Sequence, residues 1–176
     1  MDIFQSNLLE TRQQEIDILI SNNVTRLLDS KKIHYTAIEL PAEKLGAEVT
    51  ASLLNLPPEV VFKTIVVIRP KGKPLLCVIS GANIVNVKAV AELTGEKKVS
   101  IPTQSEAESL TGLQAGGISP LALINKGFTV YIDSSALNYP EIHISGGQRG
   151  LNLRLNPRDI QQLTNARFAE ISSPLG

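Results

Sequence analysis

The stretch from residue 60 to residue 80 constrains the fold of this chain more than any other. Residues 60–68 are nearly all β-branched or aromatic, which is typical of a strand. Pro70-Lys-Gly-Lys-Pro74 then supplies turn residues, and residues 75–80 return as a second apolar run. We therefore predict a β-hairpin with a basic tip, around which the other elements have to pack.

Short helical and strand patterns alternate along the rest of the chain. Apolar residues at helical spacing predict helices over residues 42–54, 86–93, 103–110 and 157–163, with another from residue 23 to near residue 31. Asn23 and Thr103 are the expected caps of two of them. Runs of β-forming residues predict further strands over 33–40, 97–101, 128–132, 141–145 and 151–155. Hairpins with helices between them indicate a mixed α+β fold rather than a regular doubly wound one.

Length and composition indicate one domain with a short extension. Residues 1–22, with an amphipathic pattern over 4–20, are predicted to be an N-terminal helical extension, and residues 23–176 a single domain. Hydrophobic residues make up 43% of the chain and no low-complexity tract is present, which is typical of a compact protein.

The charge balance limits which partners the chain can hold. Its 17 basic and 17 acidic side chains cancel, whereas a protein that binds nucleic acid by bulk charge is normally basic. We therefore expect any polyanion to be held locally, at one end. The chain has a single cysteine, no apolar run near the roughly 18 residues that span a membrane and no secretory signal pattern. A cytoplasmic location without a membrane partner is expected.

A glycine-rich stretch from Thr111 to Ala122 is the first candidate site. Gly116 and Gly117 allow backbone angles closed to other residues and a close approach of a ligand, while Pro120 restrains Ser119. Such a loop can direct several N–H groups at one carbonyl oxygen, ribose hydroxyl or phosphate. The alternative is an ordinary Gly-Pro connection, which the spacing by itself favours.

Lys63 is the second candidate, because it interrupts a strand that is otherwise almost entirely apolar. A buried ammonium without a partner is costly, so this side chain has to reach solvent, pair or face a cleft. The alternatives are a lysine that protects an edge strand from aggregation and a cation that waits for an anion in a pocket. Thr64 points to the other face of the strand and is an additional hydrogen-bond donor.

Other reactive residue types give weaker signals. Cys77 lies within an apolar run and is expected in the core. His34 and His143 alternate with apolar residues, which places each on the polar face of a strand, and neither shows metal-ligand spacing or a nucleophile partner. Ser145 and Gly146 form either a second wall of the same pocket or a simple hairpin turn.

Four motifs together resemble the YbaK / prolyl-tRNA synthetase editing-domain family. They occur in the family's order and spacing, and the resemblance covers roughly residues 23 to 172. The motifs are Val61-Phe-Lys-Thr-Ile65, Thr111-Gly-Leu-Gln-Ala-Gly-Gly-Ile-Ser-Pro-Leu121, Ile144-Ser-Gly-Gly-Gln-Arg-Gly150 and Asn165-Ala-Arg-Phe-Ala-Glu-Ile171. The resemblance implies a mixed, barrel-like sheet surrounded by helices, and a free-standing hydrolase that deacylates mischarged tRNA, in particular Cys-tRNA(Pro).

The resemblance also implies a site without metal or cofactor. Lys63 and Gly116 take the catalytic positions. The expected substrate-binding residues are Leu40, Leu45, Thr64, Gly117, Ile118, Ser119, Pro120, Ser145, Gly146 and Asn152. Because no activated nucleophile is apparent, the protein is expected to orient the ester while the substrate's own thiol attacks the carbonyl. A substrate without a thiol requires a positioned water instead.

Selectivity is the least constrained property. Cysteine-specific members tend to carry a tyrosine, a phenylalanine and an aspartate where Leu40, Leu45 and Asn152 stand. Alanine or another small amino acid is therefore an alternative substrate, and a non-catalytic module or a hydrolase of small acyl esters are alternative functions. The expected partners are the aminoacyl-tRNA acceptor end and prolyl-tRNA synthetase. Candidates for contacts with the tRNA backbone are Lys71, Lys73, Arg149 and Arg154, although solvated charge is the more ordinary explanation.

Overall fold

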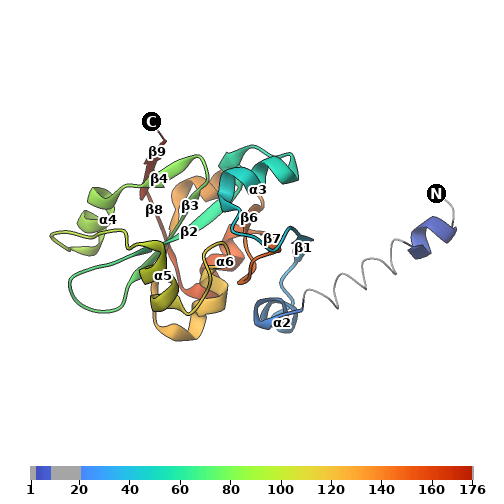
Figure 1. Cartoon of the computed structure of the whole chain (residues 1–176), viewed down its shortest axis with the longest axis horizontal. Helices are drawn as coiled ribbons and strands as arrows, with labels where there is room; N and C mark the ends of the chain where they lie inside the picture. The colour runs from blue at the N-terminus through green and yellow to red at the C-terminus, as the bar shows by residue number, and fades with distance from the viewer. Residues whose placement is uncertain (1–2, 9–20, 176) are drawn as a thin grey trace.

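The predicted hairpin forms one end of a four-stranded sheet in the computed structural model, which describes residues 3–8 and 21–175 (Figure 1). Strands β2 (Phe62–Val67) and β3 (Leu75–Ser80) pair antiparallel, with Val67 opposite Leu75. The sheet continues in parallel through β5 (Thr129–Asp133) and β8 (Arg167–Ala169), in the order β2-β3-β5-β8. Strand β2 is therefore an edge strand.

Two smaller sheets complete the β structure of the described residues. The three-stranded sheet has the order β1-β7-β6 and is antiparallel throughout, with β1 at Tyr35–Glu39, β7 at Leu151–Leu155 and β6 at Ile142–Ser145. Strands β4 (Asn83–Val85) and β9 (Ser172–Pro174) form an antiparallel pair. The mixed α+β prediction is confirmed.

Short helices join and cover the sheets, and polar side chains cap most of them. The α-helices are α2 (Asn23–Ser30), α3 (Gly46–Leu54), α4 (Val87–Thr94), α5 (Gln104–Thr111) and α6 (Pro157–Thr164). The 3-10 helices are η1 (Pro58–Val60), η2 (Pro120–Lys126) and η3 (Ser134–Asn138). Thr103 caps α5 in a full capping box, as predicted, whereas α2 is capped by Asn22 rather than Asn23.

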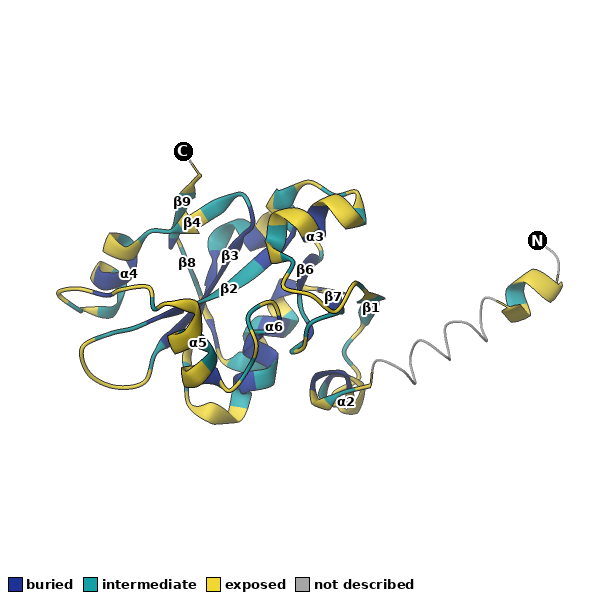
Figure 2. Cartoon of the chain, in the orientation of Figure 1, coloured by how far each residue is buried: buried dark blue, intermediate teal, exposed yellow. Residues whose placement is uncertain are grey.

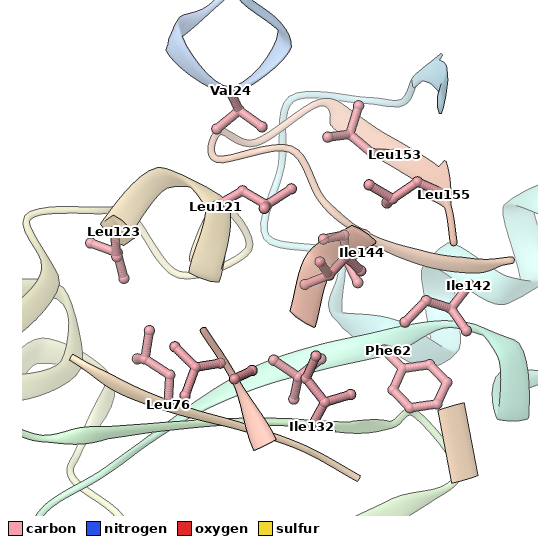
Figure 3. Packing of buried hydrophobic residues seen from close by; sticks show 14 of the residues in the cluster. Val24, Phe62, Leu76, Leu121, Leu123, Ile132, Ile142, Ile144, Leu153 and Leu155 are labelled. Carbon is pink, nitrogen blue, oxygen red and sulfur yellow. The ribbon is translucent and has the colours of Figure 1, made fainter. Parts of the chain in front are cut away.

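The core lies on both faces of the four-stranded sheet. On one face, side chains of β2, β3 and β5 meet those of β6 and β7, with α2 and η2 closing the sides (Figure 3). On the other face, Leu75, Cys77 and Ile79 pack with residues of α4, among them Val90. Because β3 alternates between two cores, all six of its residues are buried, which explains its apolar run from Leu75 to Ile79.

The helices and loops around the sheets are more exposed than the strands (Figure 2). Residues 3–8 form a short helix on which Ile3, Phe4 and Leu8 are exposed. Residues 9–20 of the predicted N-terminal extension lie outside the described residues, so the predicted boundary at residue 22 stays a prediction.

Two expectations about the β structure are wrong. The sheets of the described residues are not closed, so the fold is not barrel-like: one isolated bridge, Val61–His143, connects β2 to β6, and the two strands then separate. The predicted strand over 97–101 is reduced to a single bridge between Ile68 and Ser100, where only one residue pair exchanges backbone hydrogen bonds. Val99 nevertheless packs in the second core, which accounts for its apolar surroundings in the sequence.

Candidate active site

A cleft of about 330 Å³ opens along the outer edge of β2, between the Val61–His143 bridge and the Ile68–Ser100 bridge. Segments from several parts of the chain line it: the stretch between β1 and α3, the start of α5, the glycine loop and the turn between β6 and β7. Because the two sheets separate beyond the bridge, side chains and loops rather than a continuous ladder surround this edge.

The structure brings most of the predicted site residues together. Eight of the twelve line the cleft, namely Leu40, Leu45, Lys63, Thr64, Gly116, Ile118, Ser145 and Asn152. The other four, Gly117, Ser119, Pro120 and Gly146, are not among the lining residues. Residues from three of the four motifs thus converge on one hollow together with Leu40, Leu45 and Asn152, whereas the fourth motif, residues 165–171, contributes no lining residue. Their catalytic or binding roles stay predictions.

The edge of β2 presents backbone groups to the cleft. Within an antiparallel pair, alternate residues direct their N–H and C=O groups toward the partner strand and away from it. The carbonyl of Val61 accepts from Gly81 on the β3 side, whereas Ile68 exchanges hydrogen bonds with Ser100 on the outer side. By this alternation the N–H and C=O groups of Thr64 and Val66 point outward, along the open edge.

Lys63 lies half-buried on this strand, in the wall of the cleft. Burial lowers the pKa of its ammonium group below the ordinary 10.5, and the charge of Glu48 on α3 partly opposes that shift. Among the described residues no hydrogen bond or ion pair engages its Nζ. Lys63 thus stands on an edge strand and also faces a cleft, so its position fits both alternatives, and its role stays a prediction.

The glycine loop is fixed through the peptide groups of Ala115. Its carbonyl accepts a 2.7 Å hydrogen bond from Arg149 Nε, and its N–H donates to Glu108 Oε2 at 2.9 Å. The Ser145 hydroxyl donates to the carbonyl of Gly116 at 3.3 Å, so the loop and the β6–β7 turn are connected directly. Gly116 has φ +90°, a conformation that favours glycine.

At Gly117 and Gly146 the absence of a side chain is required by packing against the protein itself. A Cβ at Gly117 would lie 2.9 Å from Gln148 Cα, and one at Gly146 would lie 2.4 Å from the Leu151 side chain. From the sequence we expect the bare surface of Gly117 to admit a ligand. That expectation is wrong, because the turn after β6 occupies the space.

Ser119 and Pro120 lie behind the loop. Ser119 is fully buried, and its hydroxyl accepts from the N–H of Leu121 at the start of η2. Pro120 is the first residue of η2 and is also buried. Ser119 and Pro120 therefore connect the glycine loop to the core, where Leu121 and Leu123 pack.

A buried polar pair stands beside the cleft. His143 Nδ1 and Asn152 Oδ1 are 2.9 Å apart, and both side chains are about 95% buried, at 4% and 5% exposure. Burial lowers the pKa of His143; the Asn152 hydrogen bond opposes this, Arg154 adds to it, and Glu141 opposes it. His143 lies on the face of β6 opposite the core residues Ile142 and Ile144, as predicted, but this polar face is buried there, where β6 bridges to Val61.

Several charged side chains have structural partners. Lys73 donates to the carbonyl of Lys126, and Lys44 donates to Gln104 at the mouth of the cleft. Arg154 pairs with Glu141 at 3.7 Å, so neither it nor Arg149 is simply solvated. The bond from Arg149 to the glycine loop is not predicted from the sequence, where the available signal is the place of Arg149 within the Gly-Gly-Gln-Arg-Gly turn.

Other reactive groups stay outside the cleft. Cys77 is fully buried, and burial raises the pKa of its thiol to about 12, so it is a core residue as predicted. Within residues 3–8 and 21–175 no group of three or more His, Cys, Asp or Glu side chains is placed to hold a metal ion. No helix in the same part of the chain is long and apolar enough to cross a membrane.

Comparison with known proteins identifies the family. The model of the aminoacyl-tRNA editing domain matches residues 42–163, which include the β2 edge, the glycine loop and the His143–Asn152 pair. The chain belongs to the aminoacyl-tRNA editing domain family. EbsC of Enterococcus faecalis, named as a candidate Cys-tRNA(Pro)/Cys-tRNA(Cys) deacylase, is 34% identical over 153 residues, covering 86% of this chain and 93% of its own.

Two solved structures have the same architecture as this chain. A candidate trans-editing enzyme for prolyl-tRNA synthetase superposes with a TM-score of 0.73 at 27% identity, over 88% of this chain and 99% of that one. A hypothetical protein superposes with a TM-score of 0.80 at 24% identity, over 86% and 100% of the two chains, and shows the fold alone. The prediction of an aminoacyl-tRNA editing deacylase is confirmed.

Proposed function

We propose that this protein hydrolyses the ester of mischarged Cys-tRNA(Pro), acting as a free-standing enzyme in which the β2 edge and the glycine loop position the acyl group. The observation that carries this proposal is the convergence of Lys63, Gly116, Ser145 and Asn152 on one cleft in a member of the editing-domain family. The name of the relative EbsC supports the choice of substrate.

The size of the cleft suits the end of a tRNA rather than its body. Small-molecule sites usually occupy about 300–1,000 Å³, so a hollow of about 330 Å³ holds an aminoacylated ribose and little more. With 17 basic and 17 acidic side chains, the protein lacks the charge excess of a long nucleic-acid groove. We expect contact with the acceptor end, presented by prolyl-tRNA synthetase, and a cytoplasmic location.

The chemistry has to come from positioning. Cys77 is buried in the core, and the hydroxyl of Ser145 donates to a carbonyl without a histidine partner. The imidazole Nδ1 of His143 is engaged by Asn152. None of these side chains is an activated nucleophile, so catalysis depends on orientation and on stabilising the developing oxyanion.

The thiol of a cysteinyl ester supplies the missing nucleophile. Its sulfur attacks the ester carbonyl carbon, the bond from that carbon to the ribose oxygen breaks, and the thiol proton passes to the leaving ribose oxygen. Water then opens the resulting thiolactone. In this scheme the backbone N–H groups of the β2 edge or the glycine loop bind the carbonyl oxygen, and the cation of Lys63 faces a phosphate or the developing negative charge.

Alanyl-tRNA is a second candidate substrate, and the aliphatic wall favours it. Leu40 and Leu45 both line the cleft, so the acyl pocket carries no aromatic or charged group at these positions. An apolar pocket separates ligands that differ by one small group by only about 1–3 kcal/mol. Alanine has no thiol, and its ester would need a water held at the same place.

A deacylation panel tests the proposal. Purified protein is incubated with cysteinyl-, alanyl-, seryl- and prolyl-tRNA, and with cysteinyl-tRNA whose thiol has been methylated. The expected result is fastest release of cysteine and loss of that release after methylation. Equal rates with and without the methyl group would exclude the thiol mechanism, and no release above the uncatalysed rate would favour a non-catalytic binding module.

A further inference from the structure

Asn152 and His143 lie on the polar face of the β1-β7-β6 sheet. Alternate residues of β7, Leu151, Leu153 and Leu155, point into the core, so Asn152 points to the opposite face, as does Ser145 directly across from it on β6. Asn152 lines the cleft although it is only 5% exposed. A buried amide at a cleft wall has little freedom, so its orientation decides what the wall offers.

The hydrogen bonds fix which end of the amide faces the cleft. The amide oxygen Oδ1 can only accept, and it lies 2.9 Å from His143 Nδ1. No described residue binds the amide nitrogen Nδ2. Every fully buried side-chain nitrogen or oxygen of the described residues has a hydrogen-bond partner. Because Nδ2 has no such partner, it is not fully buried and is accessible from outside. The open space next to Asn152 is the cleft.

This geometry also fixes the proton on the imidazole. Because Asn152 Oδ1 cannot donate, His143 Nδ1 has to carry the hydrogen. Burial keeps the pKa of His143 below 6.5, and the charged groups that act on it, Arg154 and Glu141, have opposite signs. At neutral pH the ring is therefore neutral with its proton on Nδ1, and the other tautomer would turn the amide around.

We propose that His143 is a positioning residue that holds Asn152 with both amide N–H donors toward the cleft, where they bind an uncharged oxygen of the aminoacyl ester or its ribose. The inference rests on the proposed function for its substrate. A carboxylate at the same place would offer only acceptors. The His143–Asn152 pair thus sets the polarity of this wall, and His143 does so without touching the substrate.

The tautomer is the first test, and it needs no activity. The chain has two histidines, so nitrogen-15 NMR of the ring nitrogens is assigned by comparison with a His34→Gln variant. We expect a protonated Nδ1 and an unprotonated Nε2 in His143 at neutral pH, and loss of that preference in Asn152→Leu. A protonated Nε2 in the unmodified protein would overturn the proposal.

Binding is the second test, and it separates this inference from the proposed reaction. A non-hydrolysable amide of 3′-amino-3′-deoxyadenosine with cysteine is added, and the side-chain NH₂ signals of Asn152 are followed. We expect these signals to shift at saturation. If the analogue binds and the signals stay in place, the donors do not serve the substrate, whatever the deacylation panel shows.

Matched substitutions give the kinetic test. Asparagine at position 143 can place an N–H near the position of imidazole Nδ1–H, whereas leucine cannot. We expect His143→Leu to lower kcat/KM by about tenfold, the usual cost of one misdirected hydrogen bond, and His143→Asn to restore most of it. Thermal melts identify folded variants, and equal losses in two folded variants would overturn the positioning role.

The kinetic constants also identify the acceptor. If the donors bind the ester carbonyl, whose charge develops in the transition state, Asn152→Leu lowers kcat. If they bind a ribose hydroxyl, the same substitution raises KM and leaves kcat nearly unchanged. A change in neither constant would contradict the proposal.

Discussion

The two walls of the cleft are built in opposite ways. On the strand wall, Lys63 stands on a rigid edge strand and keeps its cation without a partner. On the loop wall, the peptide groups of Ala115 and Gly116 are held by Arg149, Glu108 and Ser145. The comparison shows that a regular strand can carry an uncompensated charge, whereas an irregular loop needs polar partners to keep one shape.

Removing the cation should give the largest effect on activity and none on folding. Lys63→Met retains the length of the side chain but deletes the charge that we propose stabilises the anionic part of the substrate. We expect kcat/KM to fall by about a hundredfold or more, as for loss of an oxyanion-stabilising group, without a decrease in thermal stability. Lys63→Arg, which keeps the charge, is the matched control. A variant that melts early would show that Lys63 is structural.

A substitution in the loop wall should lower the stability of the fold, in contrast to the substitution of Lys63, which should lower activity alone. Gly117→Ala places a Cβ 2.9 Å from Gln148 Cα, so we expect the free energy of unfolding to drop by about 1–3 kcal/mol. Gly112→Ala is the control, because its Cβ meets no atom within 4 Å and only its φ of +72° is unfavourable, at about 1 kcal/mol. Denaturant unfolding measures both, and a smaller loss at Gly117 would contradict the packing described here.

Substitution of Arg149 tests whether this side chain positions the glycine loop or attracts the tRNA by its charge. Arg149→Met deletes the bond to the carbonyl of Ala115, and we expect kcat/KM to fall by about tenfold because the loop loses one fixed point. Lys71→Met removes a charge on the hairpin tip and should change the rate by less than about twofold. If kcat/KM instead falls equally in the two variants, and this difference from the unmodified protein disappears at high salt, both side chains act by general attraction of the polyanion.

The smallest expected effect is a shift in the alkaline limb of the pH profile. Burial lowers the pKa of Lys63, so its ammonium loses the proton below the 10.5 of an ordinary lysine, and kcat/KM should fall as pH rises through that lowered value. Glu48 raises this pKa, so Glu48→Gln should move the limb to lower pH. Rates are corrected for spontaneous ester hydrolysis, and a limb that persists unchanged in Lys63→Arg would assign it to another group.

Local features of the fold were predictable, and pairings between distant residues were not. The hairpin of β2 and β3 and the Thr103 cap depend on neighbouring residues, which act through turn chemistry and short hydrogen bonds. The parallel pairing of β3 with β5 joins residues more than fifty positions apart, and no short pattern specifies it. The three-residue strands β4, β8 and β9 are too short to give a periodic signal.

The site shows the same division. Lys63 stood out because a charge inside an apolar strand is anomalous by itself. The His143–Asn152 pair did not, because it depends on the register of β6 against β7, which sets two polar side chains side by side across a turn. The sequence correctly indicates that a close neighbour lies beside Gly117, but this neighbour is the protein's own Gln148 rather than a ligand, a distinction that sequence alone does not make.

The single bridge between Val61 and His143 has a consequence for how acyl preference changes during evolution. No other β-bridge of the described residues joins the two sheets, so side-chain packing in the shared core rather than a hydrogen-bonded ladder holds them at their present angle. Substitutions in the shared core that alter that angle by a few degrees will admit a larger or smaller side chain while every lining residue stays the same. Two homologues with the same lining residues can therefore prefer different amino acids.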